Sequence, residues 1–388
     1  MLNSYFADMH IHIGRDMYDK PVKITASKSL TLTNILKESS RNKGIHMVGV
    51  IDSQSPAVQQ ELKRLIECGE AFELDGGGIQ FEEVTLILGS EIEIYDNNCQ
   101  GPIHVLCYFP TLEKIEQFSE WLVTKMKNIT LSSQRYYGTA KELQYKVKEL
   151  SGLFIPAHVF TPFKSLYGKG VHKSLTEVFD PDLIDGIELG LSSDTEMADQ
   201  IKELHHYTFV TNSDAHSLAK IAREYQEVLM DEPSFQEFEL ALHEVNGRKI
   251  SRNFGMNPKL GKYHTTVCDH CLELLQSDSK ECPTCGSHKV IKGVFDRIRE
   301  ISDTDVEHKR PPYIYQVPLE YLPKLGPKTF ENLLRHFQTE MNIIHHVSVE
   351  ELKEVIPEKL AKAIIEMREG NLVIKSGGGG KYGSIHTS

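Results

Sequence analysis

Histidines and carboxylates cluster at two places in the first 216 residues. Asp8, His10 and His12 share one short apolar segment, and Asp214 and His216 share another. Side chains two residues apart on a strand point to the same face, so His10 and His12 could bind one ion together. Zinc, manganese, iron and magnesium all fit mixed imidazole and carboxylate ligands to some extent. We therefore expect a site for divalent metal ions.

Further candidate ligands stand alone between these clusters. They are Asp52, Glu91, His104 and His158. A single strand histidine is more often packed or hydrogen-bonded than bound to a metal, so neither His104 nor His158 is informative alone. Together with the two clusters they predict a polynuclear centre of two to three divalent metals, in which Glu91 could bridge two ions.

Such a centre suits the hydrolysis of phosphoesters. It lowers the pKa of a bound water, which provides hydroxide at neutral pH, and it neutralises charge that develops on the phosphate oxygens. Catalytic roles are expected for Asp8, Glu91, Asp214 and His216. Asp8 fits either a ligand or a group that orients a histidine.

These residues lie on short apolar or β-branched segments that are typical of buried strands. Segments with helical periodicity lie between most of these strands, for example 32–43, 112–127 and 140–150, and Thr111 is expected to cap the second of these helices. This alternation predicts an α/β fold with a largely parallel sheet, and seven units predict a distorted (β/α)7 barrel. The ends of parallel strands share one rim, where distant ligands would converge. Only the sixth strand carries no candidate ligand. The strands are expected at 5–13, 47–52, 85–94, 103–109, 153–159, 184–189 and 209–214.

Four of the seven cysteines form two Cys-x-x-Cys pairs. Cys268 and Cys271 lie ten residues before Cys282 and Cys285, a spacing typical of paired knuckles around tetrahedral zinc. Four sulfur ligands leave no open position, so this ion would fold a module rather than catalyse. His270, inside the first pair, could substitute as a ligand. One structural zinc is predicted; zinc ribbons often serve nucleic-acid proteins, but many only brace domains or bind proteins.

Residues 322–330, Leu-Pro-Lys-Leu-Gly-Pro-Lys-Thr-Phe, predict a helix, a tight turn and a second helix. They resemble a helix-hairpin-helix element, in which Gly326 lets the backbone approach a phosphate and Lys328 adds charge. An ordinary capped two-helix bundle explains the same pattern. The glycine-rich end with Lys381 could lie along a DNA backbone or be a flexible terminus.

Changes in pattern divide the chain into four parts. We predict a metal-binding domain at 1–255, a zinc ribbon at 256–300, a small helical domain at 310–372 and a glycine-rich tail at 373–388.

The net charge of −12 lies entirely in the first of these parts. Residues 259–388 carry 18 basic and 18 acidic groups, so residues 1–258 hold the whole excess. An acidic domain repels phosphate unless bound cations offset its charge, so this is weak evidence against DNA and mild evidence for metals. No apolar run is long enough to span a bilayer and the start lacks a secretory signal, which predicts a cytoplasmic protein.

Taken jointly, the metal motifs resemble the polymerase and histidinol phosphatase (PHP) phosphoesterase family over residues 1–225. That resemblance implies a distorted seven-stranded barrel and a trinuclear metal site. Where the family often has Thr-Asp-His after the second strand, this chain has Ile51-Asp52-Ser53. Asp52 is the expected substitute for the missing histidine, which leaves the ligands of the third metal open. The matching motifs are Asp8-Met-His10-Ile-His12, Gly89-Ser-Glu91, His104, Ala157-His158 and Ser213-Asp214-Ala-His216.

The order of the four parts resembles the endonuclease Q family of DNA-repair nucleases over nearly the whole chain. It implies hydrolysis of the phosphodiester 5′ to uracil, hypoxanthine, xanthine or an abasic site in double- or single-stranded DNA. The damaged nucleotide would turn out of the base stack into a pocket. Candidate pocket residues, which could equally be core, are Phe160, Thr161, Phe163 and Tyr167. Candidate DNA-binding residues are Lys23, Lys28, Gly326, Lys328 and Lys381.

Two other classes of function fit these residues. Another PHP enzyme, either a small-molecule phosphatase or a 3′ exonuclease proofreader, would act on phosphate monoesters or undamaged ends. A non-catalytic binding module would use its metals only for stability. A monomer at the nucleoid is expected, and a sliding clamp is a candidate partner.

Overall fold

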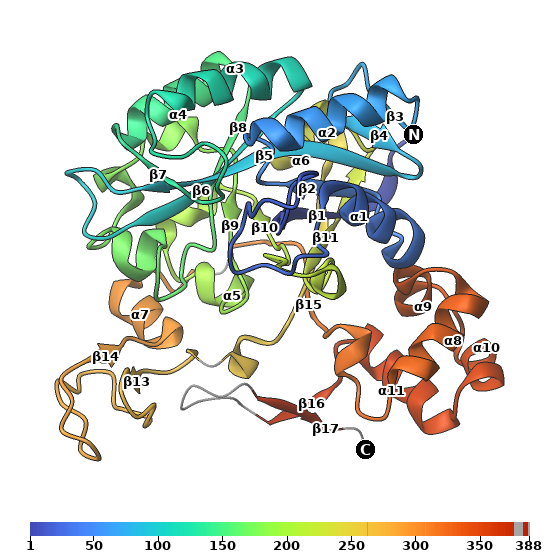
Figure 1. The fold of residues 1–388 in the computed structure, drawn as a ribbon. Coiled ribbons are helices and arrows are strands. Elements are labelled where there is room, and N and C mark those ends of the chain that lie inside the picture. Colours follow the sequence, from blue (N-terminus) through green and yellow to red (C-terminus); the bar gives the residue numbers. More distant parts are fainter. Residues whose placement is uncertain (262, 307, 376–382, 387–388) are drawn as a thin grey trace.

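The computed structural model describes residues 1–261, 263–306, 308–375 and 383–386. Strands alternate with helices through the first 255 residues, so the predicted α/β class is confirmed (Figure 1). The seven predicted strands are present, several with shorter bounds. They are β1 (Asn3–Ile11), β2 (Met47–Val50), β5 (Val84–Ile94), β6 (Ile103–Phe109), β8 (Leu153–Pro156), β9 (Ile187–Glu188) and β10 (Phe209–Val210).

The main sheet is mixed, so the prediction of a largely parallel sheet is wrong. β1 pairs in parallel with β2, and β2 with β5, but β6 is antiparallel to both β5 and β8. Only residues 95–102 join β5 to β6, which is too short for the crossover that a parallel pair needs. The sheet also contains β3 (Ala71–Glu73), β4 (Ile79–Phe81), β7 (Arg135–Tyr136), β11 (Tyr225–Met230) and β12 (Lys249–Gly255).

Hydrogen bonds pass from strand to strand around the seven predicted strands. Val159 N–H donates to Glu188 C=O between β8 and β9, and β9 pairs in parallel with β10. Beyond β10, His12 N–H donates to Ala215 C=O, which returns to β1. One rim of this arrangement therefore gathers the ends of the parallel strands together with the start of β6.

Helices cover the outside of these strands. They are α1 (Leu32–Glu38), α2 (Pro56–Glu67), α3 (Leu112–Val123), α4 (Ala140–Glu149), α5 (Thr195–Ala198) and α6 (Phe235–Leu242). Thr111 caps α3 as predicted, and its side chain accepts a hydrogen bond from Lys114 N–H. The predicted helix at 32–43 changes to a π-turn after α1 and ends before Gly44, which is left-handed. None of the helices among the described residues combines the length and apolar character needed to cross a bilayer.

The four-cysteine module contacts the α/β part through hydrogen bonds. It contains β13 (Val267–Cys268), β14 (Val290–Ile291) and α7 (Val294–Ile301). Arg297 of α7 donates to the backbone carbonyls of Tyr167 and Val171, beyond β8. The chain then rejoins the main sheet as β15 (Tyr313–Tyr315), parallel to β12. This strand therefore belongs to the sheet, although it was predicted to lie in the helical domain.

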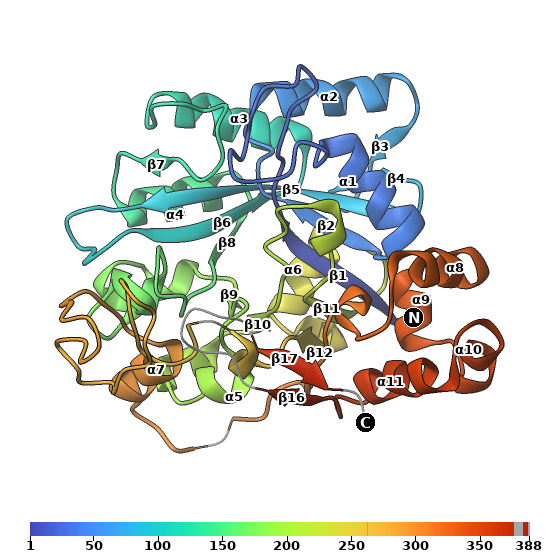
Figure 2. The same cartoon turned by 60° about the horizontal axis from the view of Figure 1, so that its bottom comes forward.

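The C-terminal helices lie across from the four-cysteine module, with a short hairpin between the two (Figure 2). Only part of the predicted helical hairpin is present. The segment before its turn is a 3-10 turn, Leu319–Tyr321, because Pro318 and Pro323 leave too few residues for an α-helix. The elements are α8 (Pro327–Phe337), α9 (Glu340–His345), α10 (Val349–Val355), α11 (Glu358–Arg368), β16 (Val373–Lys375) and β17 (Ser384–His386).

A buried ion pair joins these helices to the α/β part. Lys43 Nζ, beyond α1, lies 2.5 Å from Glu340 Oε1 at the start of α9, and both side chains are buried. At the end of α9, His345 Nε2 lies 2.6 Å from the hydroxyl of Tyr225 on β11. The His345 ring also stacks on Phe6 of β1, with a centroid separation of 4.4 Å. The helices are therefore docked on the sheet by polar and aromatic contacts together.

Replacement of Lys43 by Met should destabilise the protein, because it leaves the Glu340 carboxylate buried without its partner. We expect the free energy of unfolding in urea to fall by about 3–5 kcal/mol, followed by circular dichroism. The double variant Lys43→Met/Glu340→Leu should recover most of this loss. A single variant as stable as the original protein would show that the pair does not hold the helices.

Candidate metal centre

Six predicted ligands converge on the rim in two groups. They are His10, His12 and Asp214 in the first group, and Glu91, His104 and His158 in the second. Within each group the ligand atoms lie within 4.8 Å of one another. Residues from β1, β5, β6 and the segments after β8 and β10 are thus brought together.

Glu91 lies between the two groups. Its Oε1 is 3.7 Å from Nε2 of His10, and its Oε2 is 3.7 Å from Nε2 of His12. The same Oε1 is 2.7 Å from Nδ1 of His104 and 3.3 Å from Nε2 of His158. One carboxylate therefore faces imidazoles of both groups, which is the position of a bridging ligand.

The donor atoms fit divalent cations. The Nε2 atoms of His10, His12 and His104 are buried and have no hydrogen-bond partner within the part of the chain that the structure describes. A buried polar atom without a hydrogen-bond partner destabilises the fold unless a bound ligand interacts with it. Imidazoles beside carboxylates form a ligand set for zinc, iron or manganese.

The ionisable groups also favour bound cations. Burial raises the pKa of Glu91, but the neighbouring His104 and Lys23 hold it well below its ordinary value. Burial lowers the pKa of His10, yet the Glu188 and Asp214 carboxylates raise it to about 10. The Glu91 carboxylate thus stays ionised, and in the absence of metal His10 takes up a proton that a bound cation would replace.

Two carboxylates contact the far ring nitrogens of the first group. Asp52 Oδ2 lies 3.2 Å from Nδ1 of His12 and accepts a hydrogen bond from Ile13 N–H. Glu188 Oε1 lies 2.9 Å from Nδ1 of His10. Such contacts fix the tautomer and orientation of a ligand histidine. Asp52, predicted as a ligand, lies outside both groups, with its Oδ2 facing His12 and its Oδ1 buried without a hydrogen-bond partner among the described residues.

Glu188 contacts two of the candidate ligands and was not predicted from the sequence. It lies on β9, the strand expected to lack ligands, and also accepts hydrogen bonds from His158 N–H at 2.8 Å and Asn212 Nδ2 at 2.7 Å. The available signal was a lone glutamate in the apolar segment Gly-Ile-Glu-Leu-Gly, residues 186–190. A carboxylate on a buried strand requires a hydrogen-bond or charge partner. This requirement could have identified Glu188 as a residue of the site.

Two ligands have strained backbones. His158 has φ 31° and Asp214 has φ 44°, a region that residues other than glycine rarely adopt. Glu188 accepts from the His158 amide, while Arg223 donates to the carbonyls of Ser213 and Asp214. Surrounding contacts therefore hold the two ligands in place, as is typical of functional sites.

Asp8 lies beneath the rim rather than in either group. Its Oδ1 accepts from Ser213 N–H at 3.0 Å and its Oδ2 from Ala222 N–H at 2.8 Å. Of the two roles predicted for Asp8, these contacts favour the positioning one, since they fix the segment that carries Asp214. His216 stands beside Asp214 and its ring centroid is 4.7 Å from that of His12. Burial lowers the pKa of His216 to about 4, so its imidazole is neutral and can act as a ligand.

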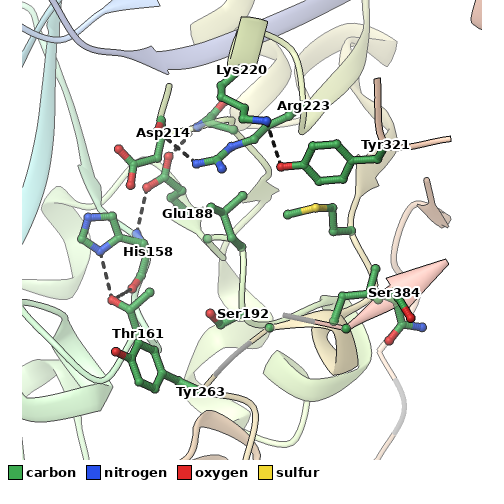
Figure 3. A pocket seen from close by; sticks show the side chains of 18 of the residues that line it. His158, Thr161, Glu188, Ser192, Asp214, Lys220, Arg223, Tyr263, Tyr321 and Ser384 are labelled. Carbon is green, nitrogen blue, oxygen red and sulfur yellow. Dashed lines mark hydrogen bonds between the residues drawn. The ribbon is translucent and has the colours of Figure 1, made fainter. Parts of the chain in front are cut away.

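A cavity of about 740 Å³ opens beside the two groups. His158 and Asp214 form one wall, and Lys220, Arg223 and Tyr321 form another (Figure 3). The Lys220 ammonium donates to the Tyr321 hydroxyl at 2.9 Å and lies over its ring, so the segment before α8 closes this side. The remaining lining includes Thr161, Ser192, Tyr263 and Ser384.

Only some of the residues predicted to form the base pocket lie at this cavity. Thr161 lines it, and Phe163 contacts Tyr263 edge to face with centroids 5.6 Å apart. Phe160 and Tyr167 do not line it, because both rings are almost fully buried and stack on each other at 5.3 Å. Their apolar surfaces belong to the core.

The predicted DNA-binding residues differ in their surroundings. Lys23 lies inside the metal centre, where its Nζ is 3.4 Å from Glu91 Oε2 and donates to Ser133. Lys28 is exposed, as are Gly326 and Lys328 at the start of α8. Lys381 lies outside the described residues.

The four cysteines of the two pairs lie close together. The sulfurs of Cys268 and Cys285 are 3.6 Å apart, and those of Cys271 and Cys282 are 3.5 Å apart. Tetrahedral Zn–S bonds of about 2.3 Å place sulfurs about 3.8 Å apart, so the group fits one zinc ion.

Comparisons with known proteins identify the family. No family model matches the chain. The "Uncharacterized protein YqxK" of Bacillus subtilis is 52% identical over 385 residues, which cover 99% of this chain and 100% of that protein. The crystal structure of the lesion-specific endonuclease PfuEndoQ from Pyrococcus furiosus superposes with a TM-score of 0.85 and 34% identity, over 99% of this chain and 95% of that one. The chain belongs to the endonuclease Q family.

A second endonuclease Q structure is a complex with a 27-mer duplex substrate that has an abasic lesion at the active site. It superposes with a TM-score of 0.84 and 33% identity, over 100% of this chain and 97% of that one. The resemblance to the endonuclease Q family therefore includes the four-cysteine module and the C-terminal helices.

The Glu188→Gln variant should bind manganese about 10–100-fold more weakly, because an amide no longer provides the charge that orients His10. Isothermal titration of the metal-free protein would measure this change. Glu61→Gln is the matched control, since Glu61 is buried and hydrogen-bonded to Thr33 away from the metal ligands. Equal affinities in the two variants would contradict the positioning role.

The Cys282→Ser variant should lose about one equivalent of zinc, because three thiolates remain in a site built for four. Elemental analysis of the purified protein would count the ion. Cys68→Ser, at an exposed cysteine outside the cluster, should leave the zinc content unchanged. Full zinc content in Cys282→Ser would exclude the four-cysteine site.

Proposed function

We propose that this protein is a DNA-repair endonuclease that hydrolyses the phosphodiester 5′ to a deaminated base (uracil, hypoxanthine or xanthine) or to an abasic site. The cavity beside the metal ligands carries this proposal. His158 and Asp214 belong both to the ligand groups and to the cavity wall. A nucleotide held in the cavity would therefore place its phosphate next to the ligands.

Divalent ions bound by the two groups would supply activated water and stabilise charge on the phosphate. The residues of the chain hold that site in place. Glu91 is shared between the groups, while Asp52 and Glu188 orient His12 and His10. Lys23 beside Glu91 carries a positive charge that the phosphate oxygens can approach.

The damaged nucleotide would enter the cavity after it turns out of the base stack. A volume of about 740 Å³ is ample for one nucleotide. Thr161, Ser192 and Ser384 offer hydroxyl groups to the edge of a base, and Tyr263 offers an aromatic ring (Figure 3). Deaminated bases pair poorly, so they are less costly to extrude than normal bases.

The flanking duplex would rest on the four-cysteine module and the C-terminal helices, which lie on either side of the β16–β17 hairpin in Figure 2. Ser384 of that hairpin lines the cavity. Lys328 and the backbone amides at the start of α8 would contact phosphates without reading sequence. All six ligands of the two groups come from one chain, which supports activity as a monomer.

Incision of end-labelled duplexes tests this proposal. With added manganese or magnesium, the protein should cut one phosphodiester 5′ to a single deoxyuridine, deoxyinosine or abasic site and leave the intact duplex whole. The Asp214→Ala variant removes a ligand and should lower the rate at least about 100-fold. Product lengths on a denaturing gel report the position of the cut.

The same gel separates the other PHP activities. Shortening of undamaged strands from their 3′ ends would instead indicate an exonuclease. Release of phosphate from monoesters, with no cut at any lesion, would indicate a small-molecule phosphatase. Either result would overturn the endonuclease proposal.

A further inference from the structure

A cation held between aromatic rings lies near the metal centre. Arg135 is on β7, which is labelled in Figure 1. This strand pairs in parallel with β5, and Arg135 lies opposite Glu93. Its guanidinium lies 4.9 Å from the ring centroid of Tyr95 and 5.4 Å from that of Tyr137. Lys127 lies over the Tyr137 ring at 5.8 Å. Two cations and two rings thus form one surface cluster.

The cluster is on the same face of β5 as the metal ligand Glu91. Glu91 and Glu93 are two residues apart on β5, so their side chains share a face, and Tyr95 directly follows the end of this strand. Arg135 is opposite Glu93, only two residues beyond Glu91. Strand geometry places the Arg135 and Glu91 backbones about 8 Å apart. The preceding loop also reaches the centre, since Ser132 contacts His12 and Ser133 donates to Glu91.

Neither cation has a carboxylate partner among the described residues. Arg135 donates one hydrogen bond, from Nη2 to the Tyr95 carbonyl at 2.7 Å. The nearby Glu93 carboxylate is paired instead with Lys164, at 2.9 Å. Lys125 in the same loop is paired with Glu142, at 2.8 Å. Arg135 and Lys127 therefore keep their charge and most of their donors for a ligand, on a protein whose net charge is −12.

The two tyrosine rings preorganise the Arg135 side chain for binding an oxyanion. An arginine normally loses side-chain entropy when it is fixed by a ligand, and stacking on two rings removes part of that freedom in advance. A planar guanidinium with free N–H groups matches the two oxygens of a phosphodiester. Successive phosphates rise only about 3.4 Å along a DNA strand, so a strand at the metal centre passes within a few nucleotides of this cluster.

We propose that Arg135 and Lys127, held on Tyr95 and Tyr137, bind phosphates of the DNA backbone next to the scissile position. This inference rests on the proposed function. The contact carries no sequence information, since it is made to phosphates, and it fixes the strand along β5 while the lesion occupies the cavity. The ligand is a phosphodiester backbone rather than a free nucleotide.

The test is the salt dependence of DNA binding by the full chain. All proteins carry Asp214→Ala so that the DNA stays intact, and fluorescence anisotropy measures Kd for a duplex with one abasic site. Addition of Arg135→Ala should weaken binding about tenfold and lower the slope of log Kd against log salt by about 0.9, since one phosphate contact is lost. Lys127→Ala should lower the slope by a similar amount.

Arg41→Ala is the matched control. Arg41 is exposed and pairs with Glu82, which precedes β5, whereas Arg135 lies at the far end of that strand. The control should leave both Kd and slope unchanged. The Tyr137→Leu variant keeps the Arg135 charge, so it should weaken binding without a change in slope. Thermal unfolding midpoints would show that each variant is folded.

The outcomes separate this inference from the proposed function. Tight lesion-duplex binding with equal slopes for Arg135→Ala, Lys127→Ala and Arg41→Ala would overturn the phosphate contact and leave the endonuclease proposal standing. Absence of any DNA binding by the parent Asp214→Ala protein, together with no incision by the unsubstituted chain, would overturn both.

Discussion

Burial of several carboxylates around a few imidazoles is the constraint on which the rest of this structure depends. Glu91, Glu188 and Asp52 are almost completely buried, and a buried charge is tolerated only when it is paired. Each contacts a histidine of the rim. The strands must therefore pair in a register that places each carboxylate beside its histidine. After this pairing, the Nε2 atoms of His10, His12 and His104 still have no hydrogen-bond partner among the described residues and are available to a metal ion. The contacts that stabilise these buried charges therefore also arrange the candidate ligands.

The parts beyond residue 255 extend this site rather than standing apart from it. β15 returns to the main sheet, Arg297 anchors the four-cysteine module, and Lys43 is paired with Glu340 in the C-terminal helices. Because these contacts cross between parts, the cavity has walls from the rim, the segment after β12 and the segment before α8. The proposed nucleotide site thus needs all of them in place.

The sequence was informative wherever residue type restricts chemistry. Paired cysteines at metal spacing and histidines two apart on a strand have few other uses, so the sequence could single out the four clustered cysteines and the six candidate ligands that meet at the rim. The type of an aromatic residue does not restrict its role in this way. Phe160 and Tyr167 suit a core as well as a pocket wall, and burial places them in the core. Glu188 was missed because one glutamate in an apolar strand has no spacing pattern to distinguish it.

The sequence by itself therefore determined the α/β class, the ligand types and the four-cysteine module. Only the tertiary structure decided strand direction, which brings His104 to the rim from the start of β6, and the placement of Asp8 and Asp52 outside the two ligand groups. It also decided the cavity, whose lining comes from segments more than 200 residues apart. The physical reason is that ligand chemistry belongs to single side chains, whereas orientation and enclosure arise from contacts between distant segments, which local sequence does not encode.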